Sequence, residues 1–165
     1  MPLPISFGQT VVMEDRITFL QDSSRLLPPA GIERREGALE LVVLHSNPRL
    51  TARALKAALK LAEGFQAAVT LVAVHVLPYP SPLECQEGLR QCLEAELTAV
   101  ARAARTPVRA RLVFARDREQ TYLRLLPNES LAVIGTRDRW WRTREERLAR
   151  KLAANGHSVA VIKVK

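Results

Sequence analysis

The sequence predicts an α/β fold, with a five-stranded parallel sheet and helices on both of its faces. Three features of residues 38–165 indicate this class. Apolar runs typical of buried strands recur along the chain, amphipathic stretches typical of helices separate them, and the connections are short. Because strands that alternate with helices pair in parallel through right-handed crossovers, the helices are expected to cover both faces.

The first strand and the first helix follow each other closely. Residues 41–44 form a continuous apolar run, as expected of a strand that is buried on both faces. Asn47 suits the cap of a helix and Pro48 its first turn. Gly64 is expected to end this helix. Its core-facing side chains are predicted to be Leu50, Ala54, Leu55, Ala58, Leu59 and Ala62.

The second strand and helix are predicted in the same way. Residues 69–77 form the second apolar run, and a capping box of Ser81 and Glu84 is expected to start the next helix. Cys85 and Cys92 lie on that helix about two turns apart, beyond the reach of a disulfide between them. We expect both to be small buried apolar side chains.

The third strand is predicted to lie at an edge of the sheet. In residues 108–114, arginines interrupt the apolar residues at alternate positions, so one face is partly solvated. Asp117 is expected to cap a short helix, which Pro127 ends.

The last part of the chain is expected to form a strand, a helix and a final strand. Residues 131–134 are an uninterrupted apolar strand, which Gly135 is expected to end in a phosphate-type turn. The last helix is expected to begin at Thr143 and to stop near Gly156. Residues 159–164 then form the fifth strand.

Residues 1–37 differ from the rest of the chain. Prolines and glycines break any long element, and residues 33–36 are a cluster of charges. We interpret residues 1–37 as an N-terminal extension, either a linker or a short element such as a hairpin or an added edge strand. Residues 38–165 are interpreted as one domain.

The chain is strongly basic, with a formal net charge of +8 and a pI near 10.3. Arginine binds phosphate and carboxylate groups, so nucleotides, nucleic acid or an acidic protein surface are candidate partners, although a solvated basic surface explains the charge equally well. No apolar run is long enough to span a membrane, and the N-terminus lacks the pattern of a secretory signal. A cytoplasmic location is therefore expected.

The sequence contains no recognised motif for catalysis or metal binding. The three histidines do not form an H-x-x-x-H pair, and the two cysteines do not form C-x-x-C. The neighbours His45 and Ser46 are not set in a G-x-S-x-G elbow, and neither a P-loop nor a G-x-G-x-x-G occurs. We therefore expect no enzyme activity and no metal site.

Polar residues gather where the predicted strands end. In open parallel sheets, ligands bind outside the carboxyl ends of the strands. The candidate residues for such a pocket are His45, Ser46, Asn47, His75, Asp117, Gly135, Thr136, Arg137 and Arg139.

An arginine-rich loop with two tryptophans follows the fourth strand. Residues 136–151 contain seven basic side chains against three acidic ones. Arginines interleaved with aromatic rings can hold phosphates and stack on bases, which makes this loop a candidate contact for an anion, nucleic acid or an acidic partner. Its candidate residues are Trp140, Trp141, Arg142 and Arg144. In the alternative interpretation, one tryptophan packs on the core or on a subunit interface, and the arginines pair with nearby glutamates.

Residues 39–164 resemble the universal stress protein domain. Three segments carry the resemblance, namely LVVLHSNPRLTARALKAALKLA, VAVHVLP and LAVIGTRDR. It covers about three quarters of the chain. The resemblance implies an adenine-nucleotide alpha-hydrolase-like fold with the strand order 3-2-1-4-5, and a homodimer formed through residues 159–164.

The chain departs from the pattern with which that family binds ATP, which is G-x2-G-x9-G-[ST] together with an aspartate after the first strand. The first glycine is kept as Gly135, but Asp138 replaces the second and Ser46 stands at the aspartate position. The final glycine and the serine or threonine of the pattern fall near Glu146 and Arg147. The resemblance therefore implies a member that lacks the intact ATP-binding motif.

The start of the last helix also argues against a bound phosphate. Thr143 and Glu146 form a capping box that occupies the backbone donors, and Glu145 adds a negative charge. We predict a non-catalytic regulatory or binding domain with no cofactor, which does not bind ATP in the usual way. Three alternatives stay open: a binding module that uses residues 137–151, a cytosolic regulatory domain of a larger transporter or sensor, and an ATP or AMP sensor or weak ATPase.

Overall fold

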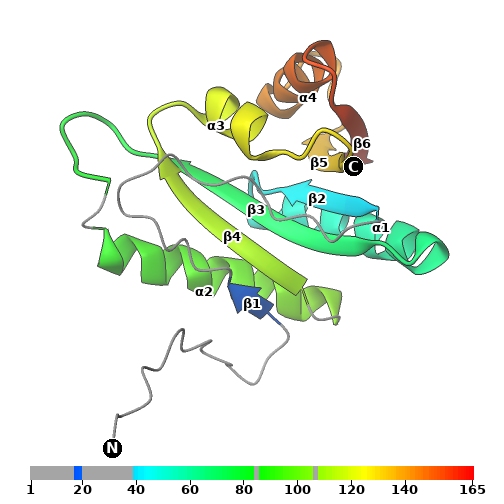
Figure 1. The fold of residues 1–165 in the computed structure, drawn as a ribbon, viewed down its shortest axis with the longest axis horizontal. Helices are drawn as coiled ribbons and strands as arrows, with labels where there is room; N and C mark the ends of the chain where they lie inside the picture. The colour runs from blue at the N-terminus through cyan, green and yellow to red at the C-terminus, as the bar shows by residue number, and fades with distance from the viewer. Residues whose placement is uncertain (1–16, 20–38, 84–85, 106–107) are drawn as a thin grey trace, which may run out of the picture.

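The apolar runs of the sequence form a parallel sheet. The computed structural model describes residues 17–19, 39–83, 86–105 and 108–165. Within these ranges six strands lie in the order β1-β4-β3-β2-β5-β6, and every neighbouring pair is parallel (Figure 1). The strands are β1 (Ile17–Phe19), β2 (Glu40–Leu44), β3 (Ala68–Val76), β4 (Val108–Ala115), β5 (Leu131–Arg137) and β6 (Ser158–Val164). Without β1 this is the predicted five-stranded order 3-2-1-4-5, so the predicted fold class is confirmed.

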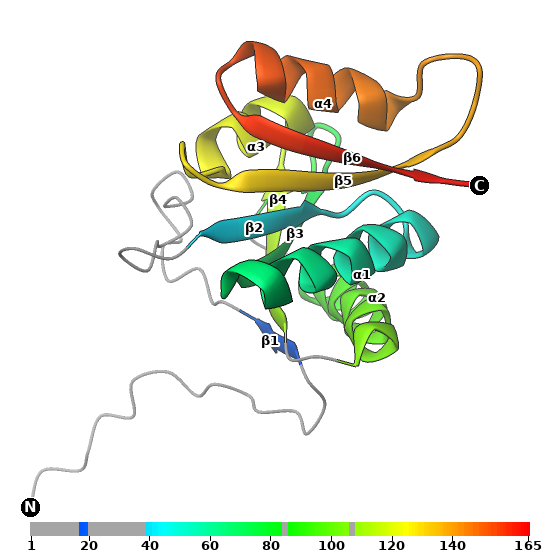
Figure 2. The same ribbon diagram turned by 90° about the vertical axis from the view of Figure 1, so that its right-hand side faces the viewer.

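Within the described residues, four helices cover the two faces of the sheet. They are α1 (Pro48–Phe65), α2 (Glu87–Ala104), α3 (Arg118–Leu125) and α4 (Arg144–Ala154). Figure 2 shows α1 and α2 on one side of the sheet and α3 and α4 on the other. Right-handed crossovers produce this arrangement, because connections that step toward β4 and connections that step toward β6 pass over opposite faces. None of the described helices is long and apolar enough to cross a membrane.

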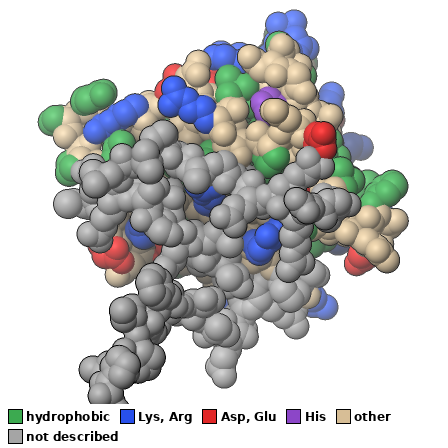
Figure 3. Space-filling view, in the orientation of Figure 1, with side chains coloured by type: hydrophobic (Ala, Val, Ile, Leu, Met, Phe, Trp, Pro, Cys, Tyr) green, Lys and Arg blue, Asp and Glu red, His purple; other side chains and the backbone are tan. Residues whose placement is uncertain are grey.

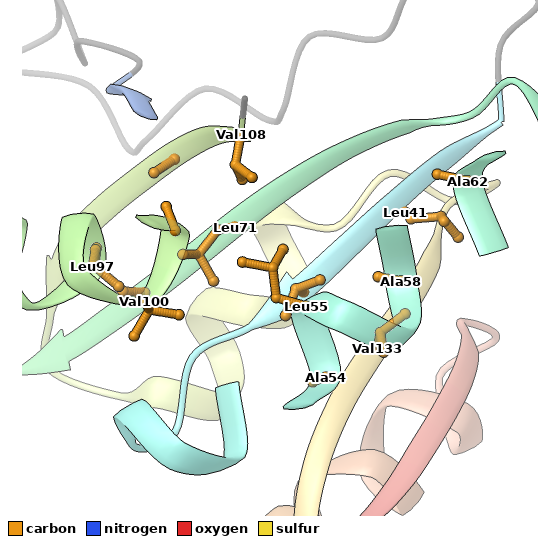
Figure 4. Packing of buried hydrophobic residues seen from close by; sticks show 14 of the residues in the cluster. Leu41, Ala54, Leu55, Ala58, Ala62, Leu71, Leu97, Val100, Val108 and Val133 are labelled. Carbon is orange, nitrogen blue, oxygen red and sulfur yellow. The ribbon is translucent and has the colours of Figure 1, made fainter. Parts of the chain in front are cut away.

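Each face of the sheet has its own apolar core. On the face covered by α1 and α2, Leu55, Leu97 and Val133 belong to one cluster of buried side chains (Figure 4). On the opposite face, Tyr122 and Leu152 belong to a second cluster. Because successive side chains of a strand point to opposite faces, the central strands β2 and β5 contribute to both cores. Their continuous apolar sequence follows from this double burial.

Three helices begin at the caps that the sequence predicts. The side chains of Asn47, Asp117 and Thr143 each accept the backbone N–H three residues further on, at 3.0, 2.9 and 3.2 Å. These bonds satisfy donors that have no partner within the helix, which fixes where α1, α3 and α4 start.

The predicted end of the first helix is wrong by a few residues. Gly64 lies inside α1, which continues to Phe65. The helix ends at Gln66, whose φ of 50° is left-handed and whose N–H donates to the carbonyl of Ala62. A single left-handed residue is enough to stop a helix, and glycine is favoured there without being required.

The predicted start of the second helix is also wrong. Ser81 does not cap α2, which begins at Glu87, while Glu84 lies outside the described residues. The guanidinium of Arg116 donates to the carbonyl of Ser81 and to two carbonyls before it. The Ser81 carbonyl is therefore bound by a side chain instead of accepting the first bond of a helix.

The third predicted strand, β4, is at the edge of the five-stranded order, but the short strand β1 covers its first three residues. Strand β4 pairs with β3 on one side and with β1 on the other, where Ile17 lies opposite Val108. The added edge strand that we considered for the N-terminal extension is therefore confirmed for residues 17–19. The rest of residues 1–37 lies outside the described residues, and the division of the chain between residues 37 and 38 stays a prediction.

Cys92 is exposed, so the prediction that it is buried is wrong. The buried face of α2 includes Leu97 and Ala101, and Leu93 packs against the same core. Cys92 precedes Leu93 and lies about 100° around the helix from it, away from the sheet. Cys85 lies outside the described residues.

Candidate functional site

A cavity of about 640 Å³ opens at the carboxyl ends of β2 and β3. Its polar lining comes from His45 and Ser46 after β2, from His75 near the end of β3, and from the first turns of α3 and α4. Ligands bind at this edge of a parallel sheet, where the connections after the neighbouring strands β2 and β5 diverge to opposite faces through α1 and α4. The cavity is therefore the candidate site.

His45 is held in place through both of its ring nitrogens. Its Nε2 lies 2.9 Å from the Glu96 carboxylate, and its Nδ1 lies 2.9 Å from the hydroxyl of Thr51. The Thr51 oxygen also accepts the N–H of Ser46 at 3.2 Å, while the Glu96 carboxylate can only accept a hydrogen bond, which requires a proton on Nε2. We therefore assign the neutral tautomer of His45 that carries its proton on Nε2 and donates it to Glu96.

The surroundings of His45 favour its neutral form. Burial lowers the pKa of His45, the Glu96 carboxylate opposes this, and the positive charge of Arg118 lowers the pKa further. In the unfolded chain the imidazole of His45 is protonated near pH 6.5, whereas in the folded chain it is protonated only at a lower pH. The contribution of His45 to stability is therefore present above pH 6.5, and is lost as the pH falls from there to the folded value.

Two residues of α3 bind the backbone carbonyl of His45. The guanidinium of Arg118 donates to this carbonyl at 2.5 Å, and the hydroxyl of Tyr122 donates to it at 3.3 Å. Among the described residues, three buried side-chain atoms have no hydrogen-bond partner: Ser46 Oγ and Arg118 Nε, which belong to residues that line the cavity, and His157 Nδ1, which does not. Buried polar atoms are rarely left unpaired, so the atoms of Ser46 and Arg118 suit a polar ligand.

Charges of both signs line the cavity. Three arginines and three glutamates contribute to its wall; the arginines are Arg118, Arg144 and Arg147, and the glutamates are Glu96, Glu119 and Glu145. Of these acids, Glu96 contacts His45 and Glu119 forms an ion pair with Lys151. The balance of charge suits a small ligand with a single negative group better than one with several.

Gly135 is not part of a phosphate-binding turn, which corrects the prediction from the sequence. It lies inside β5, which continues to Arg137, and it pairs with Ile162 of β6. A Cβ at this position would lie 2.4 Å from the carbonyl oxygen of Leu50, in the first turn of α1. Glycine is therefore required here so that α1 can pack closely on the sheet.

The other predicted pocket residues separate into two groups. Ser46 and His75 line the cavity, as does Arg144, which was predicted as a contact of the arginine-rich loop instead. Asn47 is occupied as the cap of α1, and the buried hydroxyl of Thr136 bonds to that of Thr143 at 2.6 Å. These two side chains therefore hold helix starts in place.

The tryptophan loop, residues 138–143, lines a separate groove. Arg139, Trp140, Trp141 and Arg142 line a hollow beside α4 and β6, away from the cavity, and Arg137 is exposed at the end of β5. Trp140 is 91% exposed and Trp141 50% exposed. The alternative that one tryptophan packs on the core is therefore wrong for this chain.

The sequence did not predict the residues that hydrogen-bond to His45. Glu96 belongs to α2, and Arg118 is the first residue of α3, far from His45 in the chain. Thr51 is predicted only as part of a helix. A polar residue on the otherwise apolar buried face of α1, as Thr51 is, was the one signal available.

Glu96→Gln is expected to lower the pKa of His45 further. The Glu96 carboxylate raises this pKa through its charge and its hydrogen bond, whereas burial and Arg118 act in the opposite direction and remain. An NMR titration of the imidazole measures the shift. Glu63→Gln, at an exposed position of α1, is the matched control and should leave the pKa unchanged. A pKa that rises in the Glu96→Gln variant would contradict the assigned contact.

Comparisons with known proteins find similarity in structure. No family model matches the chain, and no curated protein matches it. A universal stress protein solved in complex with cAMP is 14% identical, with a TM-score of 0.58 over 75% of this chain and 96% of that chain. A universal stress protein from Archaeoglobus fulgidus is 15% identical, with a TM-score of 0.51 over 77% of this chain and 98% of that chain. At these identities the comparisons show that the chain has the universal stress protein fold.

Proposed function

We propose that the chain is a non-catalytic regulatory domain that binds a small ligand in the cavity beside His45. The observation that carries this proposal is that two residues lining the cavity, Ser46 and Arg118, each have a buried polar atom without a partner, Oγ and Nε. A volume of about 640 Å³ lies within the range of small-molecule sites.

The ligand that we propose carries no more than one phosphate group. Arg144 and Arg147 can contact one such group, whereas Glu119 and Glu145 in the same wall oppose a triphosphate. Gly135 packs against α1, and the N–H of Glu146 is already bonded to Thr143, so neither is available to phosphates. The similar protein in complex with cAMP supports a ligand of this size and charge.

The contacts of His45 support a role without catalysis. Both of its ring nitrogens are bonded to side chains of the protein, so neither is left to contact a ligand in the cavity. Thr51 resembles a nucleophile in its position next to the ring, but it is fully buried and accepts the N–H of Ser46. The geometry fixes His45 as part of the wall of the cavity.

Isothermal titration with cAMP and with magnesium-ATP tests this proposal. We expect cAMP to bind, and Arg144→Ala to weaken it by about tenfold, because the variant loses one charge-assisted hydrogen bond. Arg124→Ala, at an exposed position of α3 outside the cavity, is the matched control. Micromolar binding of magnesium-ATP, or release of phosphate from it, would overturn the proposal.

Other parts of the proposal concern the oligomeric state of the chain, its location in the cell and its place in a larger protein. Its homodimer through residues 159–164 and its cytoplasmic location stay predictions. Among the described strands β6 pairs with β5 alone, so its outer backbone edge supports a dimer there. The regulatory role within a larger transporter or sensor is likewise a prediction.

A further inference from the structure

A second hollow lies between the tryptophan loop, α4 and β6. It measures about 580 Å³ and is more open than the His45 cavity. Figure 2 shows this loop, residues 138–143, joining β5 to α4 above β6. We call the hollow the tryptophan groove. Its floor is formed by Ala149, Ala153, Val159 and Val161, and its basic rim by Arg139, Arg142, Arg150 and Lys163.

The rim of the tryptophan groove has a strong excess of positive charge. Four basic side chains face one acid, Glu146. Arg142, Arg150 and Lys163 form no ion pair with the described residues, and all three are exposed. Figure 3 shows that other lysines and arginines are spread over the neighbouring surface around α3 and α4. The groove therefore complements a negatively charged partner.

Two aromatic rings project at the mouth of the groove. Trp140 is 91% exposed and Trp141 50% exposed, although tryptophan has the largest apolar surface of any side chain. Exposed tryptophans flanked by arginines are the residues that contribute most to protein interfaces when a partner covers them. The groove thus combines two apolar anchors with an uncompensated basic rim.

The geometry of the rings disfavours single-stranded nucleic acid as the partner. Their planes meet at 74°, with centroids 5.2 Å apart, so they cannot present parallel platforms to successive bases. The guanidinium of Arg139 already lies over Trp141, 5.2 Å from its centroid. The floor consists of alanine and valine side chains, which offer no hydrogen-bond partners to the polar edge of a base.

We propose that the tryptophan groove binds an acidic peptide segment of a partner protein. Apolar side chains of the segment cover the floor and the tryptophans, and its carboxylates face the basic rim. Val159 and Val161 lie two residues apart on one face of β6, so their spacing matches alternate side chains of an extended peptide. The proposal is independent of any ligand in the His45 cavity.

The fluorescence emission of the two tryptophans reports whether the groove is occupied. They are the two tryptophans of the chain, so the whole tryptophan emission comes from this loop. The probe is a short synthetic peptide in which glutamate and leucine alternate, labelled with fluorescein for anisotropy. We expect it to bind, to shift the tryptophan emission to shorter wavelength, and to bind more weakly as salt rises above about 0.1 M, where exposed charges are screened.

Charge reversals decide whether the rim is the binding surface. The double variant Arg150→Glu, Lys163→Glu is expected to weaken peptide binding by about tenfold or more, because it places like charges opposite the carboxylates. Arg53→Glu is the matched control, at an exposed position of α1 on the opposite face of the sheet, and should bind the peptide as the unchanged chain does.

Three results would overturn the proposal. One is a labelled oligothymidylate that shifts the emission where the acidic peptide does not, which would identify nucleic acid as the partner. Another is an emission spectrum that changes when the protein alone is diluted, which would mean that the second copy in the predicted dimer through residues 159–164 covers the groove. The third is equal binding of the acidic peptide and of a peptide with lysine in place of glutamate.

Discussion

Gly135→Ala is expected to destabilise the domain by about 3 kcal/mol, at the upper end of the usual cost of overpacking a core. The new Cβ would lie 2.4 Å from the carbonyl oxygen of Leu50 and 2.9 Å from its carbonyl carbon. Both are backbone atoms, so no side chain can rotate away and the first turn of α1 must move. Urea denaturation followed by circular dichroism measures the loss, and the midpoint of thermal unfolding should fall by roughly 10 °C.

Gly64→Ala is the matched control for this substitution. Gly64 lies within α1, and a Cβ there would meet no atom within 4 Å. Alanine is favoured over glycine in a helix, so this variant is expected to gain up to about 1 kcal/mol of stability. If both variants changed stability in the same direction, the close approach of α1 to β5 would not be the reason for Gly135.

Tyr122→Ala is expected to cost about 3–5 kcal/mol, as for other large aromatic side chains removed from a core. Tyr122 is fully buried, and its ring fills the core between α3 and the sheet. Its hydroxyl also donates to the carbonyls of His45 and Val72, at 3.3 and 3.4 Å. The same denaturation measurement applies, and a loss below about 1 kcal/mol would mean that the ring is not a core residue.

Tyr122→Phe separates the ring from its hydroxyl. We expect it to cost about 1 kcal/mol or less, since the two hydrogen bonds are long. Burial raises the pKa of Tyr122 above its ordinary value of 10.0, whereas the unfolded chain ionises near that value. Stability is therefore lost as the pH rises from 10.0 through the folded pKa, and the Tyr122→Phe variant should lose less of it.

The features that the sequence predicts well depend on neighbours along the chain. Asn47, Asp117 and Thr143 each cap a helix through a bond to the residue three positions on, so the local sequence contains both partners. Likewise, the continuous apolar runs of β2 and β5 report burial on both faces without any knowledge of the strand order. The five strands within residues 38–165, and the side of each helix that packs on the sheet, follow from such local patterns.

The features that were missed depend on residues far apart in the chain. Arg116 binds the carbonyl of Ser81, the predicted cap of the second helix, across 35 positions. The tautomer of His45 is set by Glu96, and the carbonyl of His45 is bound by Arg118, 73 positions away. No periodicity along the chain encodes such pairs, because they form only when the sheet brings the elements together.

The misinterpretation of Gly135 has the same origin. A glycine after an apolar run is common both in phosphate-binding turns and where a helix packs closely on a strand. The distance between Gly135 and Leu50 decides between these roles, and it follows from the packing of α1 on β5. The candidate pocket residues were therefore predicted at the correct edge of the sheet, while their separate roles were not.

The exposure of Trp140 also determines how this protein can be followed in solution. Tryptophan emission is the usual optical signal of unfolding because folding normally moves the indole out of water. Here that ring is 91% exposed in the folded chain, so unfolding changes its surroundings little. A denaturation curve read from the emission of Trp140 would therefore have a small amplitude. Circular dichroism of the backbone should therefore report folding, and the indole signal should report occupancy of the tryptophan groove.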